Sequence, residues 1–252
     1  MVKVIMHGCN GKMGQVITNL IKEDREIELV AGVDPYKGIE NPYPVYDSIL
    51  EVKEQTDVVI DFSNANTTDK LLADCIEKKL PVVLCTTGLS EEQLKKVEDA
   101  AKEIPVLKSA NMSLGINLLI KILKEAAKTL APAGFDIEIV EKHHNLKVDA
   151  PSGTALALAD SINEACDNIY EYKYDRSQER VERDTKEIGI SAVRGGTIVG
   201  DHEVLFAGPD EVIEFRHTAY SKGIFGKGAI EGAKFLKGQQ PGRYDMSDVI
   251  GE

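Results

Sequence analysis

The first fourteen residues constrain the fold more than any other part of the chain. An apolar run, Val2-Met6, is typical of a buried strand, and a helix is predicted to begin near Lys12. The turn that joins them reads Gly8-Cys9-Asn10-Gly11-Lys12-Met13-Gly14. Glycines allow a sharp turn and close packing of the helix on the strand, because they lack a Cβ atom. The first N–H groups of such a helix have no partner within it and can face a phosphate group.

The spacing of this loop and the acidic residue beyond it indicate a dinucleotide site. The glycines follow the pattern G-x-x-G-x-x-G, and Asn10 stands where a middle glycine is common. Asparagine is one of the few residues that tolerate a left-handed φ. Asp34 ends the second predicted strand, where a carboxylate suits the adenine-ribose hydroxyls and repels a 2′-phosphate. The expected cofactor is NADH and/or NADPH, with NADH favoured by Asp34. Lys37 could instead reach a 2′-phosphate, which would favour NADPH. The alternative to a dinucleotide site is an ordinary strand–loop–helix turn in an α/β protein that binds no nucleotide.

Short apolar runs alternate with helical patterns over the first part of the chain. Strands are predicted at residues 2–6, 28–33, 57–61, 82–84 and 106–107, and helices near 12–23, 66–79 and 90–103. Ser90 and Gln93 form a capping-box pattern at the start of the third helix. The strands lack polar alternation, as expected when both faces of a sheet are covered. This order predicts a doubly wound parallel sheet with right-handed crossovers.

The pattern changes after residue 112. Next come a predicted helix (113–130), a strand (135–140), a helix (153–166), an exposed polar loop (167–186), three strands read as an antiparallel meander (188–194, 197–206, 211–220) and a last helix (224–236). The predicted fold class is α/β: a Rossmann-like parallel-sheet nucleotide domain with an inserted α+β substrate domain built on an open mixed sheet. The predicted domains are 1–112, completed by 221–252, and 113–220.

The net charge of −12 argues against nucleic acid or an anionic membrane as a partner. No apolar run reaches the length of a membrane span, and no signal-peptide pattern opens the chain. The four cysteines are scattered, so reduced thiols in a cytoplasmic protein are expected. An anionic ligand therefore requires a local basic patch.

Small and hydroxylated residues follow three of the predicted strands. They are Asp61-Phe62-Ser63, Cys85-Thr86-Thr87-Gly88 and Ser109-Ala110-Asn111-Met112. Ligands of open α/β sheets bind beyond the carboxyl ends of the strands, where such residues permit close approach to a nicotinamide ring and its ribose. Ordinary turn chemistry is the alternative, since these residue types dominate turns.

A basic segment near residue 145 is the local basic patch that an anionic ligand requires on this acidic protein. Two histidines and two lysines lie within residues 142–147, and Ser152-Gly153-Thr154 follows Pro151 at a predicted helix start. Lysine and histidine can bind a carboxylate or move a proton, and free helix N–H groups bind a second carboxylate. A metal site is not predicted, because adjacent histidines point in different directions and no third ligand is near. A surface lysine and a plain N-cap serine remain the structural alternatives.

The segment Glu-x-His-His-x-x-Lys-x-Asp-Ala-Pro-Ser-Gly-Thr-Ala resembles the signature of the 4-hydroxy-tetrahydrodipicolinate reductase (dihydrodipicolinate reductase) family. The resemblance covers essentially the whole chain. It includes Gly8-x-x-Gly11-x-Met13-Gly14, Thr86-Thr87-Gly88, Ala110-Asn111-Met112-Ser113-x-Gly115 and Arg194-x-Gly196-x-Ile198-Val199-Gly200.

The resemblance implies NAD(P)H-dependent reduction of a small cyclic dicarboxylate in lysine and diaminopimelate biosynthesis. In the reaction that it implies, a hydride passes to C4 and a proton to the adjacent carbon. It also implies a homotetramer, which the family usually forms through its substrate-domain sheets. It implies that His143 is the proton donor/acceptor and Lys147 the proton donor, and that His144, Gly153 and Thr154 bind the substrate. The implied cofactor residues are Gly8, Cys9, Asn10, Gly11, Lys12, Met13, Asp34, Cys85, Thr86, Thr87, Ser109, Ala110, Asn111, Met112 and Lys222.

Two departures from the family pattern leave the cofactor preference open: Asn10 replaces a common glycine, and no arginine follows Asp34. Two other classes of protein are also compatible with the dinucleotide loop. One is a different Rossmann reductase such as an amino-acid dehydrogenase, which the run Pro151-Ser152-Gly153-Thr154 disfavours. The other is a redox-sensing regulator, which usually carries a DNA-binding module that the sequence does not suggest.

Overall fold

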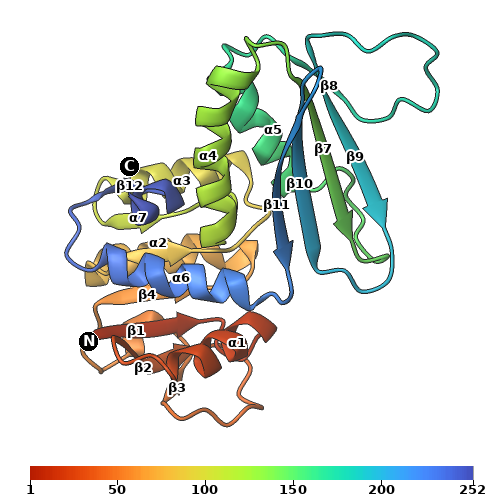
Figure 1. Cartoon of the computed structure of the whole chain (residues 1–252). Coiled ribbons are helices and arrows are strands. Elements are labelled where there is room, and N and C mark those ends of the chain that lie inside the picture. The colour runs from red at the N-terminus through yellow and green to blue at the C-terminus, as the bar shows by residue number, and fades with distance from the viewer. Residues whose placement is uncertain (252) are drawn as a thin grey trace. The chain divides into compact units, whose positions relative to one another are not determined.

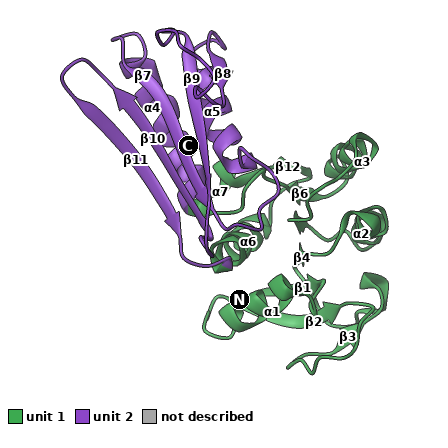
Figure 2. Ribbon diagram, turned by 90° about the vertical axis from the view of Figure 1, so that its right-hand side faces the viewer, with its two compact units in different colours: residues 1–114, 223–252 green, residues 115–222 purple. Residues whose placement is uncertain are grey.

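The computed structural model describes residues 1–251 and divides the chain into two compact units. Unit 1 consists of Met1–Leu114 and Gly223–Glu252, and unit 2 of Gly115–Lys222 (Figure 2). Because the chain leaves unit 1 once and returns to it, unit 2 is an insertion. In the described residues, no helix is both long enough and apolar enough to cross a bilayer.

Unit 1 is built on a parallel sheet, which has seven strands within residues 1–251. Their order is β12-β6-β5-β4-β1-β2-β3. The strands are β1 (Val2–His7), β2 (Ile27–Val33), β3 (Val45–Tyr46), β4 (Val58–Asp61), β5 (Val82–Leu84), β6 (Pro105–Leu107) and β12 (Gly242–Tyr244). The strand order reverses between β1 and β4, which places the topological switch point, where open α/β sheets bind ligands, at this pair.

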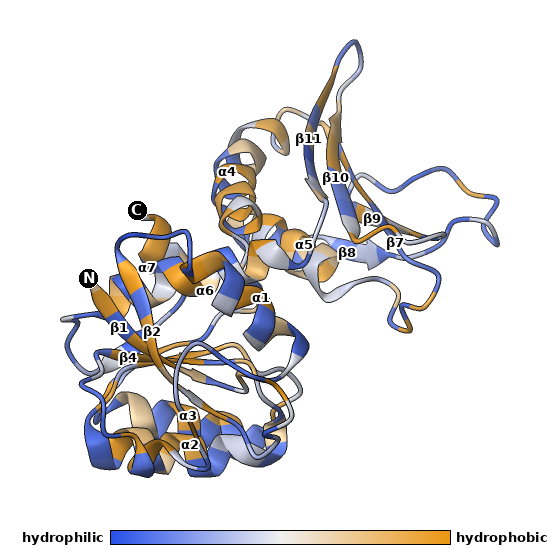
Figure 3. Cartoon of the chain, turned by 90° about the horizontal axis from the view of Figure 1, so that it is seen from below, coloured by the Kyte–Doolittle hydropathy of each residue, from blue (hydrophilic) through white to orange (hydrophobic). Residues whose placement is uncertain are grey.

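Helices cover both faces of this sheet, as Figure 1 shows for α1 and α6 on one side and α2 and α3 on the other. The helices of unit 1 are α1 (Lys12–Ile21), α2 (Ala65–Lys78), α3 (Glu91–Ala101), α6 (Gly223–Leu236), α7 (Met246–Ile250) and the 3₁₀ turn η1 (Ile49–Glu51). The predicted capping box at Ser90 and Gln93 is confirmed. The central strands are apolar on both faces (Figure 3), which explains why they lack polar alternation.

Unit 2 contains a mixed sheet of five strands among the described residues, in the order β11-β10-β7-β9-β8. Its strands are β7 (Asp136–His143), β8 (Glu171–Lys173), β9 (Glu187–Arg194), β10 (Gly200–Ala207) and β11 (Val212–Ala219), and its helices are α4 (Leu114–Leu130) and α5 (Gly153–Ala165). Both helices pack on one face through an apolar core. The predicted fold class, a Rossmann-like sheet with an inserted α+β part on a mixed sheet, is confirmed.

Two local predictions in unit 2 are wrong. The three last strands are not a simple meander, because β7 lies between β9 and β10. The turn after β9 binds the end of β7 instead, through Gly195 N to His143 O at 2.9 Å. The stretch 167–186 is not loop throughout, because β8 extends the sheet beside β9.

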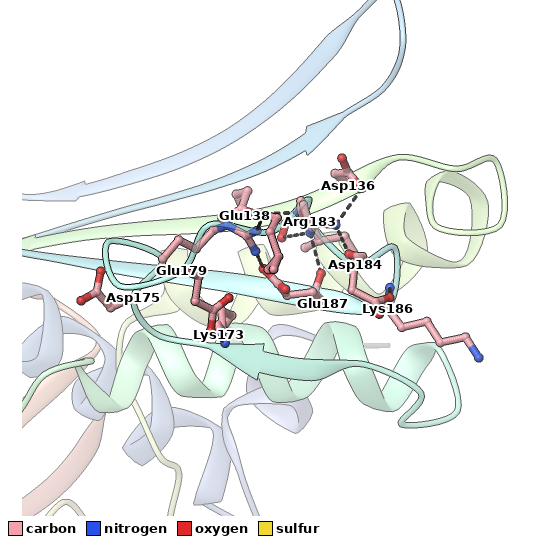
Figure 4. Close-up of polar contacts among 12 residues, drawn as sticks. Asp136, Glu138, Lys173, Asp175, Glu179, Arg183, Asp184, Lys186 and Glu187 are labelled. Carbon is pink, nitrogen blue, oxygen red and sulfur yellow. Dashed lines mark hydrogen bonds and ion pairs between the residues drawn. The ribbon is translucent and has the colours of Figure 1, made fainter.

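An arginine fastens the rest of that stretch to the sheet. Arg183 donates to Asp136 Oδ1 at 2.7 Å and to Glu138 Oε1 at 2.9 Å, and it reaches the carbonyl oxygens of Ile137 and Glu187 (Figure 4). Arg183 thus ties this polar segment to both β7 and β9, and Arg176 adds a second ion pair, to Glu187 on β9.

Candidate active site

The glycine loop has the geometry that its spacing predicts. Gly8 has φ +80°, and a Cβ atom there would lie 2.7 Å from the carbonyl oxygen of Phe62. A Cβ atom on Gly14 would lie 2.3 Å from the carbonyl oxygen of Gly8. Both contacts exclude a side chain, so the loop can lie close to the sheet and to the start of α1. This cradle follows β1, at the switch point, and its glycines fit a dinucleotide pyrophosphate.

Asn10 does not take the backbone conformation that its position suggested. Among the described residues other than glycine, only Lys79, Asp167 and Asn168 have a positive φ. Gly8 makes the sharp turn, so Asn10 does not need a positive φ, and its contribution comes from its side chain. Its amide oxygen accepts from Asn41 Nδ2 at 2.7 Å, and its amide nitrogen donates to the carbonyl of Tyr36. Asn10 therefore ties the glycine loop to the segment after β2.

Asp34 lies beside this loop and is almost fully buried. One carboxylate oxygen accepts from Asn10 N at 3.0 Å and the other from Tyr36 N at 2.9 Å. Each oxygen keeps a further lone pair, so the carboxylate can still accept a ribose hydroxyl. Lys37, which could have faced a 2′-phosphate, pairs with Asp47 at 2.9 Å. Burial, followed by the charge of Asp34, raises the pKa of the Cys9 thiol to about 11, so Cys9 is present as a neutral thiol.

A hydrogen-bonded cluster joins the carboxyl ends of three neighbouring strands. Asp61 is fully buried at the end of β4 and lies opposite His7 at the end of β1. It accepts from Thr86 Oγ1 at 2.6 Å and from Ser63 Oγ at 2.6 Å, and His7 Nδ1 lies 2.7 Å from it. Thr86, a predicted cofactor residue, is thereby fixed in place. His7 was not identified from the sequence, because its partner lies 54 residues away and no spacing rule connects them.

The other predicted cofactor residues divide between the two units. Gly8–Met13, Asp34, Cys85–Thr87 and Ser109–Met112 all belong to unit 1 and follow strands β1, β2, β5 and β6. Met112 is buried in the core, and burial raises the pKa of the Cys85 thiol well above its ordinary value. Lys222 is the last residue of unit 2. Their contacts with a cofactor stay predictions.

In unit 2 the predicted catalytic residue His143 ends β7 and is held by a buried carboxylate. His143 Nδ1 lies 2.6 Å from Glu141 Oε2, and Glu141 has no exposed surface. Arg194 donates to both oxygens of Glu141 at 2.7 Å, and Ser152 N donates to Oε1 at 2.9 Å. Burial raises the pKa of Glu141, but the hydrogen bonds from Arg194, His143 and Ser152 outweigh it, and the pKa lies below its ordinary value.

The start of α5 lies at the same end of the sheet. Ser152 is its N-cap: the hydroxyl accepts from Ala155 N at 3.1 Å and is 3.0 Å from His202 Nε2. The predicted substrate residues Gly153 and Thr154 form the first turn, where backbone N–H groups favour an anion. Nothing lies within 4 Å of the position of a Cβ atom on Gly153, so this side of the turn is open.

Lys147 and His144 lie in the loop between β7 and α5. The ammonium group of Lys147 pairs with Asp149 at 2.8 Å, and that hydrogen bond lowers the pKa of Asp149. Among the described residues, five buried side-chain polar atoms have no partner in the chain, and four of them belong to His144, Arg194, His202 and His217 of unit 2. Buried polar groups are normally satisfied, so this part of the molecule fits a polar ligand.

Sequence reasoning did not select three members of this cluster: Glu141, Arg194 and His202. One signal was available for Glu141, since residues 141 and 143 of a strand point to the same face. Burial, followed by the neighbouring charge of His143, lowers the pKa of His202 to about 4, so this imidazole is neutral near pH 7. Its ring packs edge-on against His143 with centroids 5.1 Å apart.

A parallel sheet with a glycine cradle at its switch point, together with a separate unit that carries a buried histidine–carboxylate–arginine cluster, is typical of Rossmann-type oxidoreductases. Comparison with known proteins narrows this class. The family model "Dihydrodipicolinate reductase, N-terminus" matches residues 2–112, and "Dihydrodipicolinate reductase, C-terminus" matches residues 115–250. The chain therefore belongs to the dihydrodipicolinate reductase family, and it is an NAD(P)H-dependent oxidoreductase.

Individual relatives agree over the full length. The chain is 57% identical to the 4-hydroxy-tetrahydrodipicolinate reductase of Caldanaerobacter subterraneus over 250 residues, which cover 99% of this chain and 98% of that protein. It is 50% identical to the enzyme of the same name from Clostridium tetani, with 99% and 97% covered. The fold matches the dipicolinate-bound dihydrodipicolinate reductase from Paenisporosarcina sp. TG-14 with a TM-score of 0.82, 24% identity and full coverage of both chains.

Proposed function

We propose that the chain catalyses the NAD(P)H-dependent reduction of 4-hydroxy-tetrahydrodipicolinate, via dihydrodipicolinate, to tetrahydrodipicolinate in lysine and diaminopimelate biosynthesis. Unit 1 (predicted domain 1–112 with 221–252) binds the dinucleotide, and unit 2 (predicted domain 113–220) binds the substrate. One observation carries the proposal: His143, Lys147 and the open first turn of α5 belong to one short segment of unit 2. Cationic side chains and the N-terminus of a helix together suit a small dicarboxylate.

The residues of this segment divide the chemistry between them. When bound, the nicotinamide cofactor supplies a hydride, which the substrate accepts at C4. The adjacent carbon then needs a proton, and His143 or Lys147 donates it. The same groups can assist the earlier loss of the 4-hydroxyl as water. His144, Gly153 and Thr154 bind the carboxylates, and the cationic cluster stabilises the negative charge that develops before protonation.

Asp34 supports NADH as the preferred cofactor. Its carboxylate lies where the adenine ribose is held in this fold, and a 2′-phosphate would be repelled there. Lys37 pairs with Asp47 at 2.9 Å, at a position exposed to solvent. An assay that follows the oxidation of NADH and NADPH side by side, with freshly generated substrate, tests both the reaction and the preference.

The free face of the mixed sheet supports the predicted homotetramer. Val193 and Val212 are about half exposed, and Lys142 lies within 4 Å of Asp201 and Glu203 on the same face. Apolar residues next to ordered charges are suited to a subunit interface. Light scattering of the purified protein measures the assembly directly. The cytoplasmic location stays a prediction.

Replacement of Lys147 by alanine tests the assignment of the proton donor. We expect kcat to fall about 10²- to 10⁴-fold, the usual contribution of a positioned acid, while NADH binding is retained. Steady-state kinetics and fluorescence titration with NADH measure the two effects. Lys128→Ala is the matched control, because that lysine also pairs with a carboxylate, that of Glu125, but lies exposed on α4. Unchanged turnover in Lys147→Ala would exclude Lys147 as the donor.

A further inference from the structure

Glu141 joins three separate elements of unit 2 at one buried point. Its carboxylate accepts hydrogen bonds from His143 on β7, from Arg194 on β9 and from the N-cap residue of α5, Ser152. We infer that Glu141 is a positioning residue: it fixes the tautomer of His143 and aligns that imidazole with the anion-binding start of α5. The inference rests on the proposed role of His143.

The hydrogen-bond pattern leaves one arrangement of protons. An ionised carboxylate is only an acceptor, and Arg194 is only a donor. Since Arg194 and Ser152 already donate to Glu141, the carboxylate stays ionised, and His143 must carry its proton on Nδ1. The other ring nitrogen, Nε2, is then left to accept or deliver a proton. This is the division of labour by which a buried carboxylate orients a catalytic histidine.

The surroundings of His143 hold the ring in that orientation. A Cβ atom on Gly200 would lie 3.2 Å from His143 Nε2, so a side chain at residue 200 of β10 would crowd the imidazole ring. His202 packs against the ring from β10, and its neutral state adds no positive charge beside His143. The ring is thus confined by packing on one side and by Glu141 on the other.

Ser152 extends the alignment from the imidazole to the helix. Its N–H donates to Glu141 Oε1 at 2.9 Å, while its hydroxyl caps α5 and contacts His202. A shift of Glu141 would therefore move the proton donor and the first turn of α5 relative to each other. A group that delivers a proton to a bound dicarboxylate depends on that distance.

Glu141→Gln is the decisive variant, because it keeps the shape and removes the charge. The amide nitrogen is a donor, and in either orientation it faces Arg194 together with the donor of His143 or Ser152. We expect kcat to fall at least about tenfold, with a smaller change in the KM for NADH, and the pH profile of kcat to move to lower pH as the imidazolium loses its counter-charge.

Glu138→Gln is the matched control on the same strand. Glu138 also pairs with an arginine, Arg183, but lies on the opposite face from His143. We expect kcat to stay within about twofold of the parent value and its pH profile not to shift. A loss of kcat equal to that of Glu141→Gln would overturn the inference, because any broken ion pair on β7 would then have the same effect.

Two further measurements separate positioning from stability and from the proposed function. In a His143→Gln background, Glu141→Gln should lower kcat much less than it does in the parent protein, since most of its effect passes through the missing imidazole; an equal loss in both backgrounds would overturn the inference. Nitrogen-15 NMR of the histidine rings should show a proton on Nδ1 of His143 in the parent protein. In Glu141→Leu, which offers no acceptor, the proton should move to Nε2, and an unchanged spectrum would also overturn the inference. If the parent protein does not reduce the substrate, the proposed function fails, while the NMR result still decides the role of Glu141.

Discussion

Strand β7 carries two arginine–carboxylate clusters on opposite faces, and they differ most in burial. Glu141 has no exposed surface, and both of its oxygens bind Arg194. Glu138 and Asp136, which bind Arg183, are one-third and nearly one-half exposed (Figure 4). Both arginines also donate to backbone carbonyls, so that feature does not separate the clusters.

The difference shows what burial does to the same chemical pair. A buried carboxylate needs every lone pair matched, so its geometry is fixed and can orient a neighbour such as His143. A partly exposed cluster shares its charges with water and tolerates movement, which is sufficient to fasten a loop to a sheet.

Replacing each arginine by alanine should separate the two clusters most strongly. We expect Arg194→Ala to lower the free energy of unfolding of the protein by about 3–5 kcal/mol, because a buried carboxylate loses its cation. Arg183→Ala should cost about 1 kcal/mol and expose residues 174–186 to limited proteolysis. Urea unfolding measures both, and equal losses would contradict the comparison.

The pH dependence of stability should also originate on the buried side of the sheet. Burial, and then His143, lower the pKa of His202 from 6.5 to about 4. As the pH falls below 6.5, His202 binds a proton in the unfolded chain but stays neutral in the folded chain until about pH 4. The folded state therefore loses stability between about pH 6.5 and pH 4. We expect a loss of about 2 kcal/mol from pH 7.5 to pH 5.

Unfolding at several pH values tests this expectation, with His202→Gln as the variant that cannot titrate. The carboxyl groups of Glu141 and Asp201 have lowered pKa values and lose their stabilising effect only at lower pH. Burial also lowers the pKa of His217, which acts in the same direction as His202. A pH slope that is unchanged in His202→Gln would assign the effect to other groups.

Asp34 can be compared with Glu141 and Glu138 as a third carboxylate. It is buried, but it forms no ion pair with the described residues. Two backbone N–H groups hold it beside the glycine loop. We expect Asp34→Ala to raise the KM for NADH about tenfold, equivalent to one or two lost hydrogen bonds, and to leave the KM for NADPH nearly unchanged. Equal changes with both cofactors would indicate that Asp34 supports the loop and does not select the cofactor.

The sequence predicted features that depend on a few neighbouring residues. The glycine turn after β1, the cap at Ser90 and the start of α5 after Ser152 all follow from local backbone preferences and local hydrogen bonds. The helices that were predicted agree with α1 to α6 to within about two residues, because apolar periodicity is a property of each segment alone. The short helix α7 (Met246–Ile250) was not predicted.

Long-range partners could not be predicted in this way. Ile188 and Ile190 identify β9 as a strand with an apolar face, but they do not say that β7 rather than β10 lies beside it. The tail shows the same limit, since β12 joins the sheet beside β6 although its three residues have no strand pattern. Asn10 does not have the left-handed φ that its position suggested, because the turn is made at Gly8, whose φ is +80°.

By itself, the sequence determined that a strand, a glycine loop and a helix open the chain, and that Glu141, His143, Lys147 and an N-cap serine share one segment. Only the tertiary structure decided which of them act together. Arg194 is 53 residues from Glu141 in the chain, and His202 is 50 residues from Ser152. Burial strengthens those contacts, and burial exists only once β7, β9 and β10 have packed against α5, so no short stretch of sequence could reveal it.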